Sequence, residues 1–292
     1  MTNSTVTPTA ERKVEPTRHG PIAQLLIALS PLSLILIGYA LTHWITAPLL
    51  DDPTHATNRI GIGLQVSGPA DVDRSFFAAV PTVWMQEHFA TGEPHWYDAV
   101  ASVIYVTHFM GIPLVTAVAW FRIRARFTRW IGAVLVFSTL GMAGYVLYPA
   151  APPWWASDRG EIGPVVRTSA SGWDYLHLRP IGQLLERLQD GSNPVAAMPS
   201  LHAGAALLVA LFLAPHFGRR GRVLLGTYVV GMAVTLVLTA EHYVIDVLVG
   251  WLVAVVAIAV SRKLRPSSTS APSPSPAPNA PVLRIPSSGG SR

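Results

Sequence analysis

The feature that most constrains the fold is a set of runs of about 20 residues that are almost free of charged side chains. Such a run has the length needed to cross a hydrocarbon core of roughly 30 Å. Six runs fall at residues 22–44, 98–121, 130–150, 201–217, 223–240 and 243–261. Only 13% of the residues are charged, against about 25% in a soluble domain, which argues against an ordinary soluble enzyme. The sequence therefore predicts an all-α fold, a polytopic membrane helix bundle with six transmembrane helices.

The distribution of positive charge predicts the orientation of this bundle. Six spans place both termini on one side, and 15 of the 21 Lys and Arg residues fall in segments on that side. Short loops rich in Lys and Arg remain in the cytoplasm, so we expect cytoplasmic termini and an opposite end that faces outside. The formal net charge of +5 is then a topology signal, and nucleic acid is not an expected partner.

The chain divides into a membrane region and two polar tails. Residues 1–20 are rich in Thr and Pro and predict an N-terminal cytoplasmic tail. Residues 21–265 carry the six spans and form the expected catalytic domain. Residues 266–292 are rich in Ser and Pro and predict a disordered cytoplasmic tail. Between the first two spans, residues 74–89 carry several large apolar side chains and predict a helix that lies in the membrane interface.

Three polar clusters fall at the same predicted end of the bundle. They are residues 145–155 (YVLYPAAPPWW), 193–204 (NPVAAMPSLHAG) and 239–250 (TAEHYVIDVLVG), next to the third, fourth and sixth spans. Nothing in the apolar pattern requires these clusters to share a side. Their agreement predicts a functional site at the outer membrane face.

His242 and Asp246 are four residues apart and would share one face of a helix. Ionisable side chains at the end of a span are costly unless paired or hydrated, and they mark functional sites by default. A carboxylate that holds one imidazole nitrogen fixes the tautomer and leaves the other nitrogen as nucleophile or base. An ion pair that only anchors the sixth span is the alternative.

Ser200 and His202 stand where the fourth span begins. Ser is a good N-cap, and a helix N-terminus offers free backbone N–H groups to an anion. His202, in the first turn, could donate a proton to a bound oxyanion or leaving group; a capped helix with an interfacial His is the alternative. Ser200 as a hydrolase nucleophile has less support, because the chain has no G-x-S-x-G elbow.

A phosphate substrate would also need a cationic partner, and no Lys lies on the predicted outer side. Arg167 and Arg179, in the loop between the first two clusters, are the main candidates because Arg makes bidentate phosphate contacts. Either could instead be a solvated loop charge.

A metal site is the competing chemical interpretation. His202, Glu241, His242 and Asp246 could supply N and O ligands, but there is no H-E-x-x-H, and Glu241 would point to a different helix face from its neighbour. The absence of Cys excludes Cys-ligated zinc and Fe–S clusters. His108, in the middle of the second span, is expected either to line the site from below or to make an interhelical hydrogen bond.

The motifs PSLHAG and HYVIDVLVG resemble those of the type-2 phosphatidic-acid phosphatase superfamily. Together with YPAAPPWW they look most like its inositol-phosphorylceramide-synthase-like (inositolphosphotransferase) branch, over about residues 100–265. The resemblance implies that His242 attacks phosphorus and becomes a phosphohistidine, that Asp246 orients it, and that His202 protonates the leaving group and then activates the acceptor. It also implies that Ser200 and nearby backbone N–H groups hold phosphate oxygens, and that no metal or other cofactor is required.

Two positions depart from the superfamily pattern. Gly172 stands where the Lys of a Lys-x6-Arg-Pro motif belongs, although Arg179 matches its end, and Leu236 stands where an Arg is expected six residues before His242. The phosphate-binding cation is therefore open between Arg167 and Arg179. Arg167 is favoured because it follows the Pro-Pro-Trp segment at a spacing similar to that of the bacterial branch.

Taken as a whole, the sequence predicts an integral cell-membrane phosphatase or phosphotransferase. Its expected substrate is a lipid phosphate or polyprenyl phosphate within the surrounding membrane lipid, and its acceptor is water or a hydroxyl group, with the resemblance favouring transfer. The alternative is a non-catalytic membrane transporter or scaffold that keeps the helix core. Transport predicts more polar residues within the spans and an inverted repeat, and neither is evident in the sequence.

Overall fold

The computed structural model describes residues 20–51, 57–90 and 92–263. Within these residues the regular structure is helical, with isolated β-bridges and no β-strand. The long apolar helices are α1 (Pro21–Leu29) and α2 (Ser33–Thr46), joined by the 3-10 turn η1 (Ser30–Leu32), then α6 (Trp96–Arg122), α7 (Phe127–Leu147), α11 (Leu201–Leu213), α12 (Arg219–Leu238) and α13 (Val244–Ser261). The predicted tails lie outside the described residues, apart from Gly20 at the boundary.

Five segments of the described chain are long and apolar enough to cross a membrane: Pro21–Thr46, Trp96–Arg122, Arg124–Leu147, Arg219–Leu238 and Val244–Ser261. The prediction of an all-α membrane bundle is confirmed. The exact count of six is not, because the predicted span 201–217 is the shorter apolar helix Leu201–His216. Its α-helical part ends at Leu213 and a 3-10 turn, η3 (Ala214–His216), follows. Pro215 in that turn has no backbone N–H to continue an α-helix.

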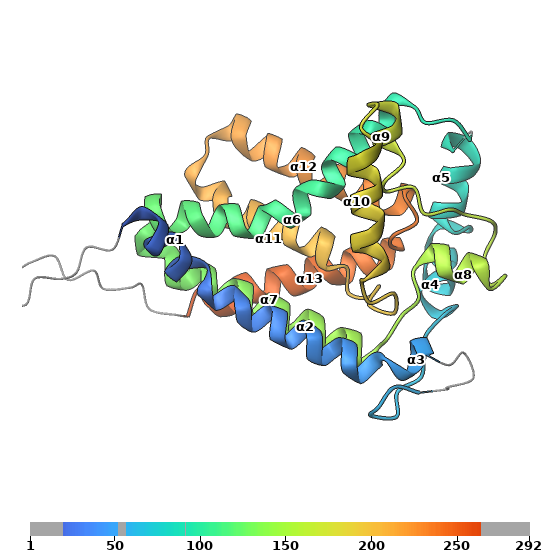
Figure 1. Ribbon diagram of the computed structural model, residues 1–292, viewed down its shortest axis with the longest axis horizontal. Coiled ribbons are helices and arrows are strands. Elements are labelled where there is room, and N and C mark those ends of the chain that lie inside the picture. Colours follow the sequence, from blue (N-terminus) through green and yellow to red (C-terminus); the bar gives the residue numbers. More distant parts are fainter. Residues whose placement is uncertain (1–19, 52–56, 91, 264–292) are drawn as a thin grey trace, which may run out of the picture.

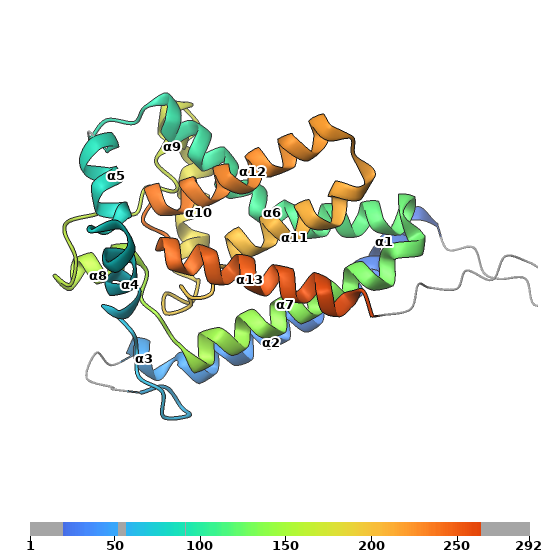
Figure 2. The ribbon, with the colours of Figure 1, turned by 180° about the vertical axis from the view of Figure 1, so that it is seen from behind.

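The long helices run back and forth along one direction, and the short helices gather at one end of the bundle (Figures 1 and 2). The short helices are α3 (Pro48–Asp51), α4 (Gly68–Phe77), α5 (Pro81–Phe89), α8 (Pro153–Asp158), α9 (Gly172–Tyr175) and α10 (Arg179–Asp190). Helix α13 packs against α11 and α7. This arrangement brings the starts of α6, α11 and α13 to the end that carries the short helices.

Residues 74–89 do not form the single helix that the sequence predicted. Helix α4 ends at Phe77, because Ala78 adopts a left-handed conformation with φ of 60°. Helix α5 then begins with Pro81, whose fixed φ suits the first turn of a helix. The large apolar side chains Phe76, Phe77 and Trp84 are nevertheless exposed, as expected of an interfacial segment.

Two glycines allow α11 and α13 to approach closely. A Cβ atom at Gly204 would lie 2.7 Å from the backbone oxygen of Gly250, and a Cβ atom at Gly250 would meet the backbone oxygen of Ser200. The same contact lets the Ser200 N–H donate to the backbone oxygen of Asp246 at 2.9 Å. The close packing therefore fixes the starts of α11 and α13 relative to each other, and both starts carry candidate site residues.

Candidate active site

Backbone hydrogen bonds join the three polar clusters at the end of the bundle. The Ala150 N–H donates to the Val195 carbonyl at 2.9 Å, which links the first cluster to the second. The second meets the third through the Ser200–Asp246 bond already described. The Trp154 N–H lies 3.4 Å from the Ala240 carbonyl oxygen, linking the first to the third. Segments almost 100 residues apart in sequence thus form one site.

His242 and Asp246 are adjacent, but not in the way that the sequence suggested. Helix α13 begins at Val244, so His242 precedes the helix and the two residues do not share a helical face. His242 is instead held by a turn in which the N–H groups of Glu241 and His242 both donate to the Leu236 carbonyl, at 3.0 and 3.1 Å. The Asp246 carboxylate reaches back to the start of its helix, where it accepts the Tyr243 N–H at 2.9 Å. It lies 3.6 Å from His242 Nδ1.

Asp73 of α4 gives the start of α13 a second carboxylate contact. Its two oxygens accept the N–H groups of Val244 and Ile245 at 2.9 and 3.0 Å, and the residue is 1% exposed. Burial raises the pKa of the Asp73 carboxyl, and the two backbone N–H groups oppose that rise. Sequence reasoning missed this residue, since no local pattern connects positions that are 171 residues apart.

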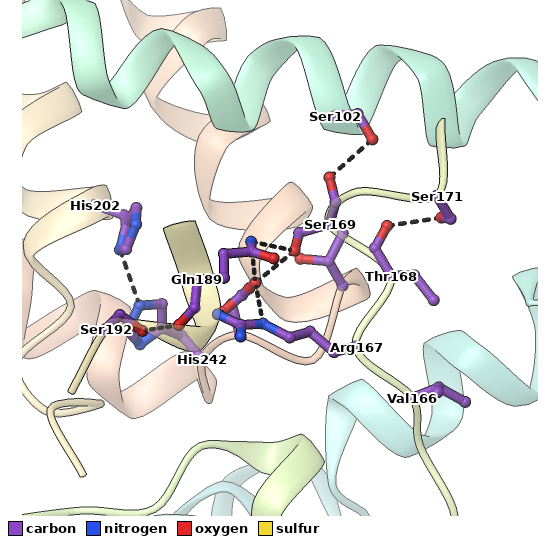
Figure 3. Close-up of polar contacts among 12 residues, drawn as sticks. Ser102, Val166, Arg167, Thr168, Ser169, Ser171, Gln189, Ser192, His202 and His242 are labelled. Carbon is purple, nitrogen blue, oxygen red and sulfur yellow. Dashed lines mark hydrogen bonds and ion pairs between the residues drawn. The ribbon is translucent and has the colours of Figure 1, made fainter. Parts of the chain in front are cut away.

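His202 lies in the first turn of α11, and its ring faces His242. The Ser200 hydroxyl caps this helix by accepting the Ala203 N–H at 3.3 Å. His242 Nε2 lies 3.3 Å from His202 Nδ1 (Figure 3). Helix α6 supplies two further rings against His202: Tyr105, stacked with a centroid distance of 5.2 Å, and His108, tilted at 4.1 Å. The structure thus brings His202, His242 and Asp246 together and places His108 beside them.

Arg167 forms a bidentate ion pair with Glu241. Its Nε and one terminal nitrogen donate to the two carboxylate oxygens at 2.8 and 2.9 Å. Ser169 donates to the same carboxylate at 2.6 Å and Gln189 at 3.2 Å, and Figure 3 shows Arg167 and Gln189 converging there. Burial by itself lowers the pKa of the Arg167 guanidinium, but the hydrogen bonds and charge of Glu241 outweigh it and raise that pKa.

The two other candidate phosphate ligands lie elsewhere. The Arg179 side chain is 79% exposed at the start of α10, and its Nε lies 3.6 Å from Asp174. Ser200 is fully buried. Neither residue lines the cavity described below.

The structure explains both departures from the superfamily pattern. A Cβ atom at Gly172 would collide with the backbone of Asp98 and Ala99, because α9 crosses α6 at that point. A lysine therefore cannot stand at position 172 without moving these helices apart. Leu236, which replaces the second expected cation, is fully buried among apolar residues of the core. An arginine there would bring a charge into this apolar cluster and would need a buried partner.

Three of the candidate residues, Arg167, His202 and His242, open onto a cavity of about 830 Å³. Its polar end is lined by Trp154, Arg167, Gln189, His202, Glu241 and His242. It then continues between α1, α2, α6 and α7 as an apolar chamber that we define by Leu29, Leu32, Leu36, Phe109, Ile112 and Phe137. Leu36 is also 71% exposed, so the chamber reaches the lipid-facing surface of the bundle. A polar end joined to an apolar chamber suits a ligand with a charged head and an apolar chain.

The role of Glu241 is the main feature that sequence reasoning assigned differently. The sequence offered it only as a metal ligand. The structure instead pairs it with Arg167, and the described residues contain no group of three or more His, Asp or Glu side chains arranged to hold a metal ion. The signal available in the sequence was a carboxylate directly before His242 at the end of an apolar span, where an ionisable side chain calls for a partner.

Comparison with known proteins identifies the family of the chain. The model of the PAP2 superfamily matches residues 70–260, which include every candidate site residue. A phosphoinositol dihydroceramide synthase of Bacteroides thetaiotaomicron is 28% identical over 79% of this chain and 74% of its own length. The catalytic subunit aur1 of an inositol phosphorylceramide synthase from Schizosaccharomyces pombe is 29% identical over 47% of this chain and 33% of its own length.

These relatives agree with the inositolphosphotransferase-like motifs in the sequence. No solved structure matches the chain significantly. Because its described residues include five apolar helical segments long enough to cross a membrane, the chain is an integral membrane protein, and it belongs to the PAP2 superfamily.

Proposed function

We propose that this membrane lipid phosphatase or phosphotransferase moves a phosphate-bearing head group from a lipid donor to a hydroxyl acceptor through a phosphohistidine on His242. One observation carries the proposal. In the wall of the cavity, His242 has Nδ1 beside the Asp246 carboxylate at 3.6 Å and Nε2 beside His202 at 3.3 Å. One imidazole nitrogen is thus oriented by a carboxylate, and the other is next to a second proton carrier.

The first step breaks the bond between phosphorus and the leaving oxygen of the donor. His242 Nε2 attacks phosphorus, an N–P bond forms, and His202 gives its proton to the leaving oxygen. The buried Asp246 carboxylate stabilises the positive charge on the His242 ring. The phosphoryl group takes the space between His242 and His202, so their direct contact opens when the substrate binds.

The second step reverses the first with a different alcohol. The acceptor oxygen attacks phosphorus, the N–P bond breaks, and the acceptor proton passes to His202, which returns to its starting form. Water as acceptor gives a phosphatase, and a lipid or sugar hydroxyl gives a transferase. The same chemistry serves both outcomes.

Arg167 is the proposed phosphate-binding cation. It lines the polar end of the cavity with His202 and His242, whereas Arg179 does not. Two of its N–H groups are engaged by Glu241, and a guanidinium has five. A further side-chain hydrogen bond joins Arg167 to Tyr105, so phosphate binding requires the guanidinium to turn from these resting partners to the substrate. Backbone N–H groups in the first turn of α11, next to Ser200, add donors at a helix N-terminus.

The relatives favour transfer over hydrolysis. The name of the bacterial relative pairs a phosphoinositol group with dihydroceramide, and that of the yeast relative describes an inositol phosphorylceramide synthase. We propose by analogy that the donor head is a phosphorylated polyol and the acceptor a lipid alcohol. The apolar chamber provides space for a chain of either lipid.

The proposed orientation places the site at the outer membrane face, with cytoplasmic termini. The end of the bundle opposite the short helices carries the clustered basic residues: Arg122, Arg124, Arg126, Arg129, Arg219, Arg220, Arg222, Arg262 and Lys263. Positive charge of this kind remains on the cytoplasmic side. The site lies at the other end.

The test is to measure phosphate release and head-group transfer from a panel of lipid phosphates, polyprenyl phosphates and phosphatidylinositol in EDTA. The purified wild-type protein is compared with His242→Ala. We expect activity in the wild type alone. Free phosphate, or free inositol phosphate from phosphatidylinositol, reports hydrolysis, and a new lipid product reports transfer. Equal activity in both proteins would contradict the role of His242. Activity that requires an added divalent metal would contradict the metal-free mechanism, and a protein silent under all conditions would favour the transporter or scaffold alternative.

A further inference from the structure

His108 is a ring that the proposed mechanism does not use, although it lies against the mechanism's second histidine. Its centroid is 4.1 Å from that of His202, and it lines the same cavity. Its Nδ1 is enclosed without a hydrogen-bond partner among the described residues. Nε2 makes no hydrogen bond there either, so it is the nitrogen available to a bound molecule.

The position of His108 is the boundary between the two parts of the cavity. Helix α6 runs from the site end of the bundle toward the opposite end (Figure 1). Tyr105, one turn earlier, stacks on His202 at the polar end, while Phe109 and Ile112 line the apolar chamber. A lipid whose chain fills the chamber would therefore bring its polar terminus to His108 and His202.

We propose that His108 binds the hydroxyl group of the acceptor lipid and so decides between transfer and hydrolysis. A hydroxyl group has one hydrogen and two lone pairs. The hydrogen faces His202, which takes the proton; one lone pair attacks phosphorus as the N–P bond to His242 breaks. The second lone pair accepts a hydrogen bond from the His108 N–H. All three hydroxyl positions are then used, and the alcohol is oriented for attack.

This inference rests on the proposed double displacement but goes beyond it, because it assigns the choice of acceptor to one side chain. Water is small and can reach the phosphohistidine without His108. A lipid alcohol is constrained by its chain in the chamber, so a single oriented hydrogen bond has a larger effect on its reaction. Loss of the His108 N–H should therefore reduce transfer more than hydrolysis.

Three variants separate the hydrogen bond from the packing of the ring. His108→Phe keeps an aromatic ring against His202 and removes both nitrogens. His108→Gln carries an amide nitrogen near the position of Nε2, and His108→Asn carries one near Nδ1. His216→Phe is the matched control, since His216 is exposed in η3 at the opposite end of the bundle.

The experiment uses the full-length protein in detergent or vesicles, with labelled phosphatidylinositol as donor and a short-chain dihydroceramide as acceptor. Donor cleavage, free inositol phosphate and the transfer product are followed together. We expect His108→Phe and His108→Asn to lower the ratio of transfer to hydrolysis by about tenfold, as for one lost hydrogen bond. His108→Gln should recover much of the ratio, and His216→Phe should leave both the ratio and donor cleavage as in the wild type.

The outcomes separate the role of His108 from the double displacement through His242. An unchanged ratio in His108→Phe with intact donor cleavage would overturn the role of His108 and leave the double displacement in place. If His108→Phe and His108→Gln both lost transfer and hydrolysis to the same extent, the role would also be overturned. The packing of the ring against His202 would then explain the loss without a hydrogen bond to the acceptor. Absence of donor cleavage in the wild-type protein would overturn the proposed function, and this inference with it.

Discussion

Two pairs of ionisable side chains meet at the polar end of the cavity, and they are held in different ways. His242 and Asp246 are fixed through the backbone, by the turn at Leu236 and by the carboxylates that cap α13. Arg167 and Glu241 are joined by side chains: the guanidinium, the carboxylate and the flanking Ser169 and Gln189. The backbone-held pair resists displacement, whereas a side-chain network can exchange one oxygen ligand for another.

The difference assigns the two pairs to different tasks. A nucleophile benefits from a fixed orientation toward phosphorus. A phosphate-binding cation must instead turn from its resting partner to the substrate, and the Glu241 carboxylate occupies Arg167 with the same bidentate geometry that a phosphate would use. We therefore expect substitutions in the first pair to act mainly on kcat, and substitutions in the second mainly on KM.

The largest effect is expected for the backbone-held pair. His242→Ala should lower transfer by about 10⁴-fold or more, as for the loss of other covalent nucleophiles. Asp246→Asn should lower kcat by about 10²–10⁴-fold through loss of ring orientation. Steady-state kinetics with phosphatidylinositol measure both. His216→Ala, remote from the site, should leave the rate unchanged. If Asp246→Asn changed KM and not kcat, the two pairs would not differ in the way proposed.

The two arginines test the side-chain pair. Arg167→Ala removes charged hydrogen bonds to phosphate and should lower kcat/KM by about 10²-fold. Arg167→Lys should recover only part of that loss because Lys lacks the planar fork. Arg179→Ala, outside the cavity, should change kcat/KM by less than about twofold. A larger loss in Arg179→Ala than in Arg167→Ala would reverse the assignment of the phosphate-binding cation.

Glu241→Gln sharpens the idea that Arg167 exchanges partners. The substitution keeps an oxygen for the guanidinium but removes the negative charge that competes with phosphate. Inorganic phosphate should then inhibit transfer about fivefold more tightly than in the wild type, an effect of about 1 kcal/mol. The apparent Tm should fall by a few degrees because a buried ion pair is broken. Weaker inhibition would show that Glu241 orients Arg167 toward phosphate rather than competing with it.

The smallest effect on activity is expected at Asp73, whose carboxylate accepts two backbone N–H groups of α13. Asp73→Asn removes a carboxylate that accepts two N–H groups, at a cost of about 1–2 kcal/mol. A lower apparent Tm in a thermal-shift assay and a modest drop in kcat with unchanged KM would fit this. The exposed Asp71 of the same helix provides the control, since Asp71→Asn should leave both quantities close to the wild type.

The sequence predicted the parts of the fold that follow from local pattern. The apolar runs predicted the long helices, and the three polar clusters predicted that their residues meet at one end of the bundle. Two errors have physical causes. The α-helix that starts at Leu201 ends early because Pro215 interrupts it, and residues 74–89 break at Ala78, whose left-handed conformation no propensity rule signals.

Part of the candidate site could be predicted from the sequence because it lies in local motifs. His202, His242 and Asp246 stand in short motifs, so the sequence could name them, although it placed His242 on a helix that begins two residues later. The pairing of Arg167 with Glu241 joins positions 74 residues apart, and the contact of Asp73 with α13 is more distant still. Long-range side-chain partners of this kind depend on packing, which a single sequence does not encode in any local pattern.

The central claim is the covalent intermediate on His242, and trapping it is the most direct test. The wild-type protein is mixed with phosphatidylinositol that carries a label in its head group, quenched at alkaline pH to preserve phosphohistidine, and digested for mass spectrometry. We predict an adduct of the labelled inositol phosphate, joined through an N–P bond, on the peptide that contains His242. It should be absent from His242→Ala and consumed when dihydroceramide is added. Turnover in the wild type with no adduct at His242, or with an adduct on another residue, would contradict it.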